Sequence, residues 1–373
     1  MSGQASGQKL LLHVFPSFAA GGAQMRFVTL AGHFGQDFRH AVIAMDGDLS
    51  CRTRLSPELL VCFPPFVPGA VGLVSRLSRA RAALRRLRPD VLITSNWGAI
   101  EWAIANLVPI ARHIHTEDGF GVEERGRQLQ RRVVTRRLVL RRSVVVVPSC
   151  TLQGIARDIW RIPAARLCHI PNGIDLSRFR PASPPRRGDL QVIGCVAALR
   201  REKNLARLLH AVHGLTDRHR LRLIIAGDGP ERLALRALAG ELGLDVEFLG
   251  EVADPAPLYR RFDAFALASD TEQMPLSVLE AMASGLVVVT TDVGDIGTMV
   301  AAENRPFVSG HDDSALTKSL AALIVAPERR HEIGAANRRR AELEFDQQFM
   351  FRRYRALLDR ACEGTATTWA PTW

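Results

Sequence analysis

Two glutamates eight positions apart could bind the hydroxyl groups of a ligand. They are Glu272 and Glu280, in the otherwise largely apolar segment SDTEQMPLSVLEAMASG. Because Pro275 is typical of the first residue of a helix and Gly285 of the position that ends one, we expect a helix from Pro275 to Ser284. Glu272 then lies in the loop before the helix and Glu280 about a turn and a half inside it, so the two carboxylates do not share a helical face.

The start of the expected helix is suited to a phosphate group. Met274, which precedes it, has no side-chain oxygen to cap the first helical amides, and uncapped amides at a helix start attract anions. A group one turn deeper is displaced by about 5.4 Å, roughly the step from a phosphate to the ribose of the same nucleotide. Glu280 could there accept hydrogen bonds from two vicinal hydroxyls, while Glu272 could reach the group that a diphosphate carries. Solvated carboxylates and hydrated amides explain the spacing equally well.

The composition describes a globular protein that attracts anions. The chain has 373 residues, 47% of them hydrophobic and 23% charged, which is enough for two domains with separate cores. The net charge of +11 favours nucleic acid, phosphorylated ligands or acidic lipid as partners. The six cysteines lack metal-ligand spacing, so we expect reduced thiols, a cytoplasmic location and no metal site. We expect no signal peptide and no membrane-spanning helix, because no segment approaches the roughly 18 uncharged apolar residues that a span needs.

Short apolar runs alternate with longer segments of helical pattern along nearly the whole chain. This alternation is typical of βαβ units, in which helices cover a sheet of parallel strands. The expected strands are residues 9–15, 40–45, 90–95, 112–115 and 143–149 in the first half, and 190–197, 221–227, 246–250, 264–269, 285–291 and 305–310 in the second. The sequence therefore predicts an α/β fold of two Rossmann-like, parallel-sheet domains facing each other across a cleft. Ligands of such domains bind beyond the carboxyl ends of the strands.

A segment rich in proline and arginine, residues 178–189, separates the two series of strands and is typical of an exposed linker. We therefore expect domains at residues 1–180 and 181–345. A C-terminal helix at residues 346–362 is expected to pack back toward the N-terminal domain, and residues 363–373 are expected to form a disordered tail.

The segment with the two glutamates resembles the E-x7-E signature of glycosyltransferase family 4, a family of retaining GT-B glycosyltransferases. Glu272, Pro275, Glu280 and Ala281 match its usual E-G-x-P-x-x-x-x-E-A form, whereas Gln273 replaces the common glycine. Other segments are similar to family motifs and follow the family's order: FAAGGAQ (18–24), IPNGID (170–175), GCVAALRREKNLARLLHA (194–211) and IIAGDGPE (224–231). The resemblance implies a GT-B fold and the transfer of a hexosyl unit from a nucleotide-diphosphate sugar to an acceptor hydroxyl, with retention and without a metal ion or cofactor.

The resemblance identifies the C-terminal domain as the nucleotide-sugar domain. Lys203 would there neutralise the diphosphate as the glycosidic bond breaks. The arginine that assists this lysine in the family is replaced by Ala198, so Arg200 or Arg201 is expected to take over. The expected donor-binding residues are Gly21, Gly22, Arg200, Lys203, Glu272, Met274, Pro275, Leu276 and Glu280.

The resemblance identifies the N-terminal domain as the acceptor domain. Gly21 and Gly22 follow its first strand, where their backbone could approach the diphosphate or the sugar. His115 ends an expected strand near the cleft and is similar to a family histidine beside the donor sugar or the acceptor. Glu117 and Asp118 are alternatives for the acceptor contact. The expected catalytic residues are Glu272, Lys203 and His115.

Other motifs are expected to lie outside the chemistry. Asn172 and Gly173 are expected to serve a hinge between the domains, and Asp228 a turn. Residues 74–89 carry six arginines and residues 125–142 carry eight. Both segments are compatible with a solvated basic face, and equally with a surface that binds anionic lipid, as in family members that glycosylate lipid-linked acceptors.

The sequence thus predicts a hexosyltransferase of polysaccharide, lipopolysaccharide or glycolipid assembly, peripheral on the inner face of the membrane. Its expected partners are a nucleotide sugar and a glycan or lipid-linked acceptor, with no nucleic acid. Two alternatives stay open. Ala198 and Gln273 allow a non-catalytic GT-B protein, and the charge allows a nucleic-acid-binding protein, although the arginines lack interleaved aromatic residues.

Overall fold

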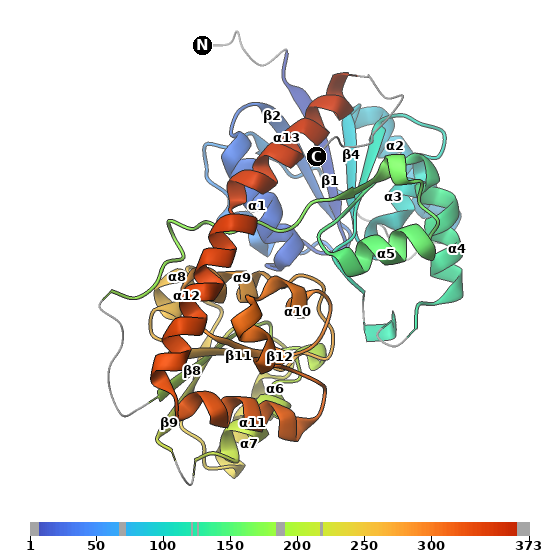
Figure 1. Cartoon of the computed structure of the whole chain (residues 1–373). Helices are drawn as coiled ribbons and strands as arrows, with labels where there is room; N and C mark the ends of the chain where they lie inside the picture. The colour runs from blue at the N-terminus through green and yellow to red at the C-terminus, as the bar shows by residue number, and fades with distance from the viewer. Residues whose placement is uncertain are drawn as a thin grey trace. The chain divides into compact units, whose positions relative to one another are not determined.

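The computed structural model of this chain consists of two compact units (Figure 1). Residues 1–171 and 351–373 make up the first unit, and residues 172–350 make up the second unit. The described residues are 7–66, 72–120, 122–124, 127–183, 191–216 and 219–363.

The first unit ends at Pro171, earlier than the expected boundary at residue 180. The segment that follows is bonded within the second unit, because the amide of Ile174 donates to the carbonyl of Phe345 at 2.8 Å and the amide of Gln347 donates to the carbonyl of Ile174 at 3.0 Å. Residues 184–190 of the expected linker and residues 364–373 of the expected tail lie outside the described residues.

A sheet of seven parallel strands forms the centre of the first unit, in the order β3-β2-β1-β4-β5-β6-β7. Helices cover both faces, which is why most of the strands are largely apolar, although β5 has the polar sequence RHIHT. Leu12 and Val14 of β1 pack on one face with α2 and α3, whereas Phe15 packs on the other with α1. The strands are β1 (Lys9–Phe15), β2 (Phe38–Ala44), β3 (Val61–Cys62), β4 (Val91–Ser95), β5 (Arg112–Thr116), β6 (Val144–Val147) and β7 (Leu167–His169).

The α-helices of the first unit are α1 (Gly22–Phe34), α2 (Leu73–Leu87), α3 (Ile100–Ala105), α4 (Gln130–Val139), α5 (Cys150–Asp158) and α13 (Gln347–Glu363), of which α13 starts in the second unit. Its short 3-10 helices are η1 (Ser50–Arg54), η2 (Trp97–Ala99), η3 (Val122–Glu124), η4 (Leu140–Arg142) and η5 (Ala164–Arg166). Helix α13 packs beside α1, where the ring of Phe351 stacks on His33 with centroids 3.7 Å apart. No helix within the described residues has both the length and the apolar run that a bilayer crossing requires.

The second unit has a sheet of six parallel strands in the order β10-β9-β8-β11-β12-β13. The strands are β8 (Gln191–Val196), β9 (Leu221–Ala226), β10 (Val246–Gly250), β11 (Ala264–Leu267), β12 (Val288–Thr291) and β13 (Val308–Ser309). The helices are α6 (Leu205–His213), α7 (Arg232–Glu241), α8 (Ala256–Tyr259), α9 (Leu276–Ala283), α10 (Ile296–Met299), α11 (Asp313–Ile324) and α12 (Pro327–Glu344), with η6 (Arg201–Lys203) and η7 (Ala302–Phe307). The predicted pair of parallel-sheet domains is therefore confirmed.

Two turns meet at the carboxyl edge of the second sheet. Gly227 and Gly229, in the turn after β9, have φ values of +139° and +159°. A Cβ atom on either would lie within 2.4 Å of a carbonyl in the turn after β8, so only glycine fits. Between them, the carboxylate of Asp228 accepts from the amide of Gly229 and pairs with Arg232, so it is engaged within its own turn. The close contact of the two turns fixes the segment that leads to Lys203.

Candidate active site

An ion pair joins the loop after β11 to the turn after β8 in the second unit. The ammonium of Lys203 lies 2.5 Å from Oε1 of Glu272, and the hydroxyl of Ser269 donates to the same oxygen at 2.8 Å. The side chains of Lys203 and Glu272 are 22% and 9% exposed. The structure thus brings two predicted site residues from separate motifs into direct contact, with the lysine still reachable from solvent.

A second ion pair anchors the same loop. Arg207 of α6 lies 2.9 Å from Oδ1 of Asp270, and the side-chain amide of Asn204 donates to Asp270 at 3.2 Å. The amide of Asp270 donates to the carbonyl of Glu202 at 2.9 Å. The loop that carries Glu272 is therefore bonded to the segment around Lys203 through backbone and side chains. The ion pair of Arg207 with Asp270 could not be predicted from the sequence, because nothing in the spacing of the two residues indicates a contact.

Helix α9 begins one residue later than expected. Pro275 is its N-cap, with extended backbone at ψ 127°, and the helix runs from Leu276 to Ala283. The carbonyl of Pro275 accepts from the amides of Val278 at 3.2 Å and Leu279 at 3.4 Å, which places the proline outside the helix. No side chain caps the helix start. Among the described residues, no acceptor lies within hydrogen-bonding distance of the amides of Leu276 and Ser277, which leaves them to bind an anion.

The carbonyls of Gln273 and Met274, which precede α9, are in contrast both hydrogen-bonded. The side chain of Asn172 donates to the carbonyl of Met274 at 2.9 Å, and the amide of Asp295 donates to the carbonyl of Gln273 at 2.9 Å. Gly294, with φ +59°, packs so closely that a Cβ atom would lie 2.4 Å from the carbonyl of Glu272. Asn172 is buried, and it belongs to a segment expected to serve only a hinge. Its bond to Met274 connects that segment to the predicted phosphate site.

Glu280 lies inside α9 and accepts a hydrogen bond from a residue that sequence analysis missed. The hydroxyl of Tyr259, a fully buried residue of α8, donates to Oε2 of Glu280 at 2.6 Å. Burial raises the pKa of Glu280, and the nearby Asp254 adds to this, while the bond from Tyr259 and the charge of Arg178 oppose it. Burial and the charge of Glu280 raise the pKa of Tyr259 well above its ordinary value, so its hydroxyl stays protonated and donates.

The two candidates for the second cation are both exposed. Arg200 is the N-cap of η6, and its amide donates to the carbonyl of Ala198 at 2.9 Å. Neither Arg200 nor Arg201 has an acidic partner among the described residues, so both side chains are available to a ligand. The choice between them stays a prediction.

The remaining predicted residues belong to the first unit. Gly21 is the N-cap of α1, with extended backbone, and Gly22 is the first helical residue. A Cβ atom on Gly21 would lie 2.8 Å from Oε1 of Gln24, whose amide nitrogen donates to the carbonyl of Ser17 at 2.7 Å. Gln24 thus folds back over the glycine turn and orders it.

His115 is buried inside β5 rather than placed at an open strand end. The strand continues to Thr116, and the histidine has no exposed surface. Its Nδ1 lies 2.8 Å from the hydroxyl of Thr94 and its Nε2 lies 3.4 Å from Glu117, which accepts from Arg136 at 3.1 Å. The expected strand end at His115 is therefore one residue too early, and the surrounding polar groups enclose the histidine. Its catalytic role stays a prediction that needs a rearrangement of this network.

The alternatives for the acceptor contact differ in exposure. Glu117 is fully buried, whereas the side chain of Asp118 is 16% exposed and forms a two-pronged ion pair with Arg26. The backbone amide of Asp118 donates to the side-chain oxygen of Asn96 at 2.7 Å. Of the two carboxylates, only Asp118 is accessible to an acceptor.

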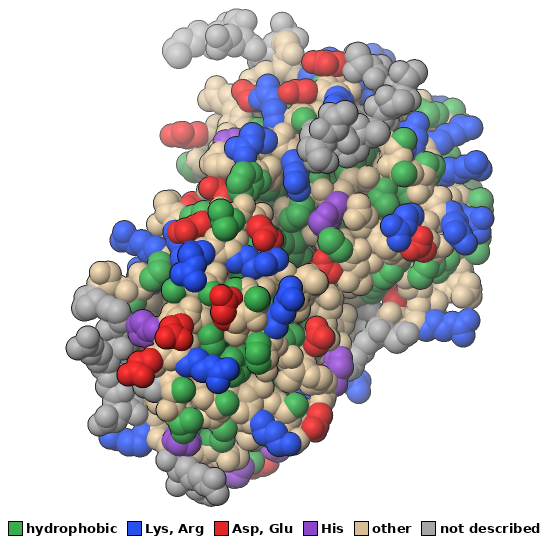
Figure 2. Space-filling view, viewed as in Figure 1, with side chains coloured by type: hydrophobic (Ala, Val, Ile, Leu, Met, Phe, Trp, Pro, Cys, Tyr) green, Lys and Arg blue, Asp and Glu red, His purple; other side chains and the backbone are tan. Residues whose placement is uncertain are grey.

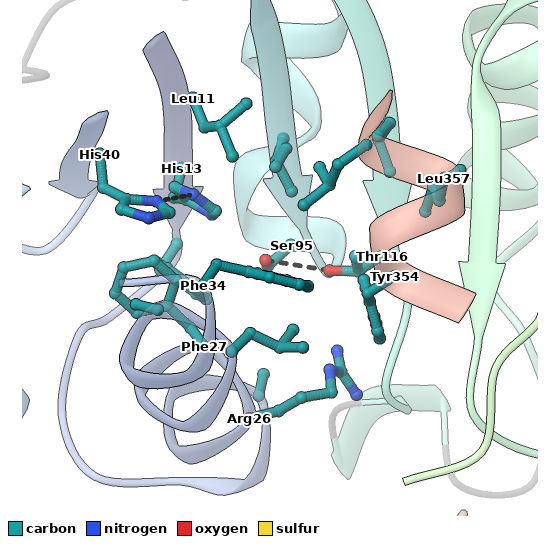
Figure 3. A pocket seen from close by; sticks show the side chains of 17 residues that line it. Leu11, His13, Arg26, Phe27, Phe34, His40, Ser95, Thr116, Tyr354 and Leu357 are labelled. Atoms are coloured by element: carbon teal, nitrogen blue, oxygen red, sulfur yellow. Dashed lines mark hydrogen bonds between the residues drawn. The ribbon is translucent and has the colours of Figure 1, made fainter. Parts of the chain in front are cut away.

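A cavity of the first unit has none of the predicted donor-binding residues among its lining residues (Figure 3). It is bounded by β1, β4 and β5 with α1 and α13, and its wall is mainly apolar, with Phe27, Phe34 and Leu357 among the lining side chains. Ser95 and Thr116 bond to each other at its floor. Arg26, the charged side chain of this wall, is already paired with Asp118. Within the described residues, no cluster of three or more His, Cys, Asp or Glu side chains is arranged to bind a metal ion.

Two solved structures share this architecture. Sucrose-phosphate synthase from Thermosynechococcus elongatus aligns with a TM-score of 0.80 over 96% of this chain and 100% of the other, at 17% identity. HepE from Anabaena, in complex with UDP and glucose, aligns with a TM-score of 0.79 over 94% of this chain and 99% of the other, at 20% identity. The fold is thus that of the GT-B glycosyltransferases.

Two family models and one similar protein show to which family of GT-B proteins the chain belongs. The model described as Glycosyltransferase Family 4 matches residues 20–178, and the model described as Glycosyl transferases group 1 matches residues 178–340. The GDP-mannose-dependent monoacylated alpha-(1-6)-phosphatidylinositol monomannoside mannosyltransferase of Corynebacterium glutamicum is 28% identical over 281 residues, which cover 70% of this chain and 72% of the relative. The chain belongs to glycosyltransferase family 4.

Proposed function

We propose that this glycosyltransferase moves a hexosyl unit from a nucleotide-diphosphate sugar to an acceptor hydroxyl, with retention of the anomeric configuration and without a metal ion. The observation that carries the proposal is the contact of Lys203 with Glu272 beside the uncapped start of α9. A cation, a carboxylate and free helical amides at the carboxyl edge of one parallel sheet form a suitable environment for a diphosphate and its sugar. The UDP-bound neighbour of the same fold supports a nucleotide as the ligand.

The proposed reaction exchanges one glycosidic bond for another. The bond from the anomeric carbon to the diphosphate breaks, the acceptor oxygen forms a new bond on the same face of the sugar, and the acceptor proton passes to the leaving phosphate. Lys203 and the amides of Leu276 and Ser277 would stabilise the charge that grows on the diphosphate. Glu272 would bind the sugar hydroxyls, which places its carboxylate near a sugar that becomes cationic in the transition state.

The nucleotide is expected to be positioned by its ribose. Glu280 lies one turn inside α9, and its carboxylate would accept the two ribose hydroxyls. Arg200 or Arg201 would add the second positive charge that Ala198 no longer provides. Together these contacts of the second unit would bind the nucleotide part of the donor, and Gly21 and Gly22 of the first unit would add backbone contacts to it.

We propose a glycan or lipid-linked acceptor and a cytoplasmic site of action at an anionic membrane surface, in the assembly of a polysaccharide, lipopolysaccharide or glycolipid. The relative named for a phosphatidylinositol monomannoside supports a lipid acceptor. Helix α4 exposes two apolar side chains, Val134 (52%) and Leu138 (68%), among Arg131, Arg137 and Arg141, which have no acidic partner among the described residues. Blue basic and green apolar side chains alternate along the edge that α2, α3 and α4 occupy (Figure 2).

A donor screen tests the proposal. The purified chain is incubated with UDP-glucose, UDP-galactose, UDP-N-acetylglucosamine and GDP-mannose, with and without membrane lipid extract, and nucleotide diphosphate release is measured. We expect lipid-stimulated release from one donor, undiminished by EDTA, and a product of unchanged anomeric configuration by NMR. Absence of release from every donor would leave the non-catalytic alternative, and salt-sensitive binding to DNA or RNA in its place would favour the nucleic-acid-binding alternative.

A further inference from the structure

Tyr259 has its hydroxyl fixed against Glu280. The ring is fully buried and packs against Phe179, Phe262 and Phe265, with centroid distances of 5.7, 5.6 and 5.8 Å. The hydroxyl donates to Oε2 of Glu280 at 2.6 Å and lies 3.2 Å from the carbonyl of Ser277. Because three aromatic rings restrain the tyrosine, the position of its hydroxyl is set by the core of the second unit.

The bond leaves the carboxylate only partly occupied. An ionised carboxylate has about four acceptor positions, and Tyr259 uses one of them on Oε2. Among the described residues, no donor lies within hydrogen-bonding distance of Oε1, and the side chain of Glu280 keeps partial exposure. Glu280 therefore presents one free oxygen, in an orientation that the tyrosine determines.

We infer that Tyr259 is a positioning residue for nucleotide recognition: it orients the carboxylate of Glu280 so that Oε1 and the open side of Oε2 accept the 2′- and 3′-hydroxyls of the ribose. The inference rests on the proposed function, because it takes the ligand to be a nucleotide. Two hydroxyls on adjacent carbons need two acceptors at a fixed angle. If the carboxylate rotated freely in the unbound protein, ordering it on binding would cost free energy and weaken the affinity for the nucleotide.

A purely structural role for Tyr259 makes a different prediction. If the hydroxyl only satisfied a buried carboxylate, its removal would lower stability and affect all ligands equally. If it orients Glu280, its removal weakens binding only for ligands that carry ribose hydroxyls. The chain offers a matched control, since it has two tyrosines and Oη of the other, the buried Tyr354 of the first unit, has no partner among the described residues.

The experiment measures affinity by calorimetry for the full chain and for its Tyr259→Phe and Tyr354→Phe variants. The probes are UDP, GDP and their 2′,3′-dideoxy counterparts. We expect Tyr259→Phe to weaken binding of the preferred nucleotide by about tenfold and to leave the dideoxy form unchanged, since a hydrogen bond to a charged group contributes on this scale. Tyr354→Phe should change neither affinity. In a Glu280→Gln background, Tyr259→Phe should have no further effect on affinity.

The outcomes separate the inference from the proposed function. Equal weakening of the nucleotide and its dideoxy form in Tyr259→Phe, or no weakening of either, overturns the positioning role alone. A wild-type chain that binds the dideoxy form as tightly as the nucleotide overturns the role of Glu280. A wild-type chain that binds neither UDP nor GDP contradicts the proposed function, and the inference falls with it. Circular dichroism and thermal melting confirm that each variant is folded.

Discussion

At the scale of single residues, the pairing of Lys203 with Glu272 has a direct kinetic consequence. In the proposed reaction the lysine stabilises charge that develops on the leaving diphosphate, so Lys203→Ala should lower kcat by about 10²-fold or more. The loss should be larger in kcat than in donor binding, because the charge grows in the transition state. Steady-state kinetics with the preferred donor measure both. Lys318→Ala is the matched control, since this lysine is exposed on α11 of the same unit.

An unchanged kcat in Lys203→Ala would place the diphosphate elsewhere in the second unit. Glu272 offers a companion test, because its partner Lys203 is only partly exposed and removal of the carboxylate leaves that cation unpaired. Loss of activity in both single variants, with little further loss in the double variant, is the pattern of two groups that act as one unit.

At the scale of elements, the start of α9 depends on contacts from distant segments. Asn172 donates to the carbonyl of Met274, and its removal should let that peptide turn and misdirect the amides of Leu276 and Ser277. We expect Asn172→Ala to weaken nucleoside diphosphate binding by about tenfold while leaving inhibition by the free nucleoside unchanged, because only the phosphate contacts are affected. Competition assays with UDP, GDP, uridine and guanosine measure this difference.

A buried asparagine elsewhere in the same unit provides the control. The side chain of Asn337 donates to the carbonyl of Leu286 at 2.9 Å and is fully buried, so Asn337→Ala loses a comparable bond beyond the C-terminal end of α9, not at its start. It should lower the melting temperature without changing the ratio of diphosphate to nucleoside affinity. If Asn172→Ala behaves like Asn337→Ala, then Asn172 supports the fold and not the phosphate site.

The elements also show what the sequence alone can predict. Both parallel sheets follow from apolar runs separated by helical patterns, and the motif order predicted the family. Pro275 was placed one position too far into α9, because the φ of proline fits an N-cap and a first helical residue alike and only ψ separates them. His115 was placed at a strand end because the apolar run stops there, whereas pairing of Ser95 with Thr116 extends β5.

Contacts between segments that are distant in the sequence could not be predicted, for a different reason. Tyr259 lies 21 positions before Glu280, and Asn172 lies 102 positions before Met274. Neither interval is a helical or strand repeat, so no periodicity can reveal the contact. Both partners are brought together only when the sheet of the second unit has formed. The structure thus brings two residues of the predicted motifs, Lys203 and Glu272, into contact, whereas the contacts of Tyr259 and Asn172 could not be predicted from the sequence.

At the scale of the whole molecule, buried histidines make stability depend on pH. Burial lowers the pKa of His40 to about 4, burial and the neighbouring His115 lower the pKa of His113 to about 3, and burial and His40 lower the pKa of His13 well below 6.5. The unfolded chain binds these protons near pH 6.5, so stability is complete above that pH and falls as the pH drops toward the folded values. Each histidine contributes about 1.4 kcal/mol per pH unit in that window.

Urea unfolding at pH 7.5 and pH 5.5 checks this expectation. The interval lies above the range in which most carboxylates titrate, so histidines dominate the change. We expect a clearly lower midpoint at pH 5.5, and a smaller difference between the two pH values in His40→Gln. His311→Gln, at an exposed position of the second unit, should keep the full difference. Midpoints that agree at the two pH values would mean that these histidines are reached by water in solution.

We propose that the net charge of +11 and the exposed face of α4 together bring the molecule to an anionic membrane surface. Basic side chains contribute about 1 kcal/mol each near an anionic surface, and Val134 and Leu138 can enter the headgroup region between them. We expect Leu138→Ser to reduce sedimentation with phosphatidylglycerol vesicles several-fold and to change nothing with neutral phosphatidylcholine vesicles. Leu233→Ser is the control, because Leu233 is 82% exposed on α7 of the second unit and should not affect binding. Equal binding by Leu138→Ser and wild type, with binding lost in high salt, would mean that charge alone brings the chain to lipid and that α4 does not insert.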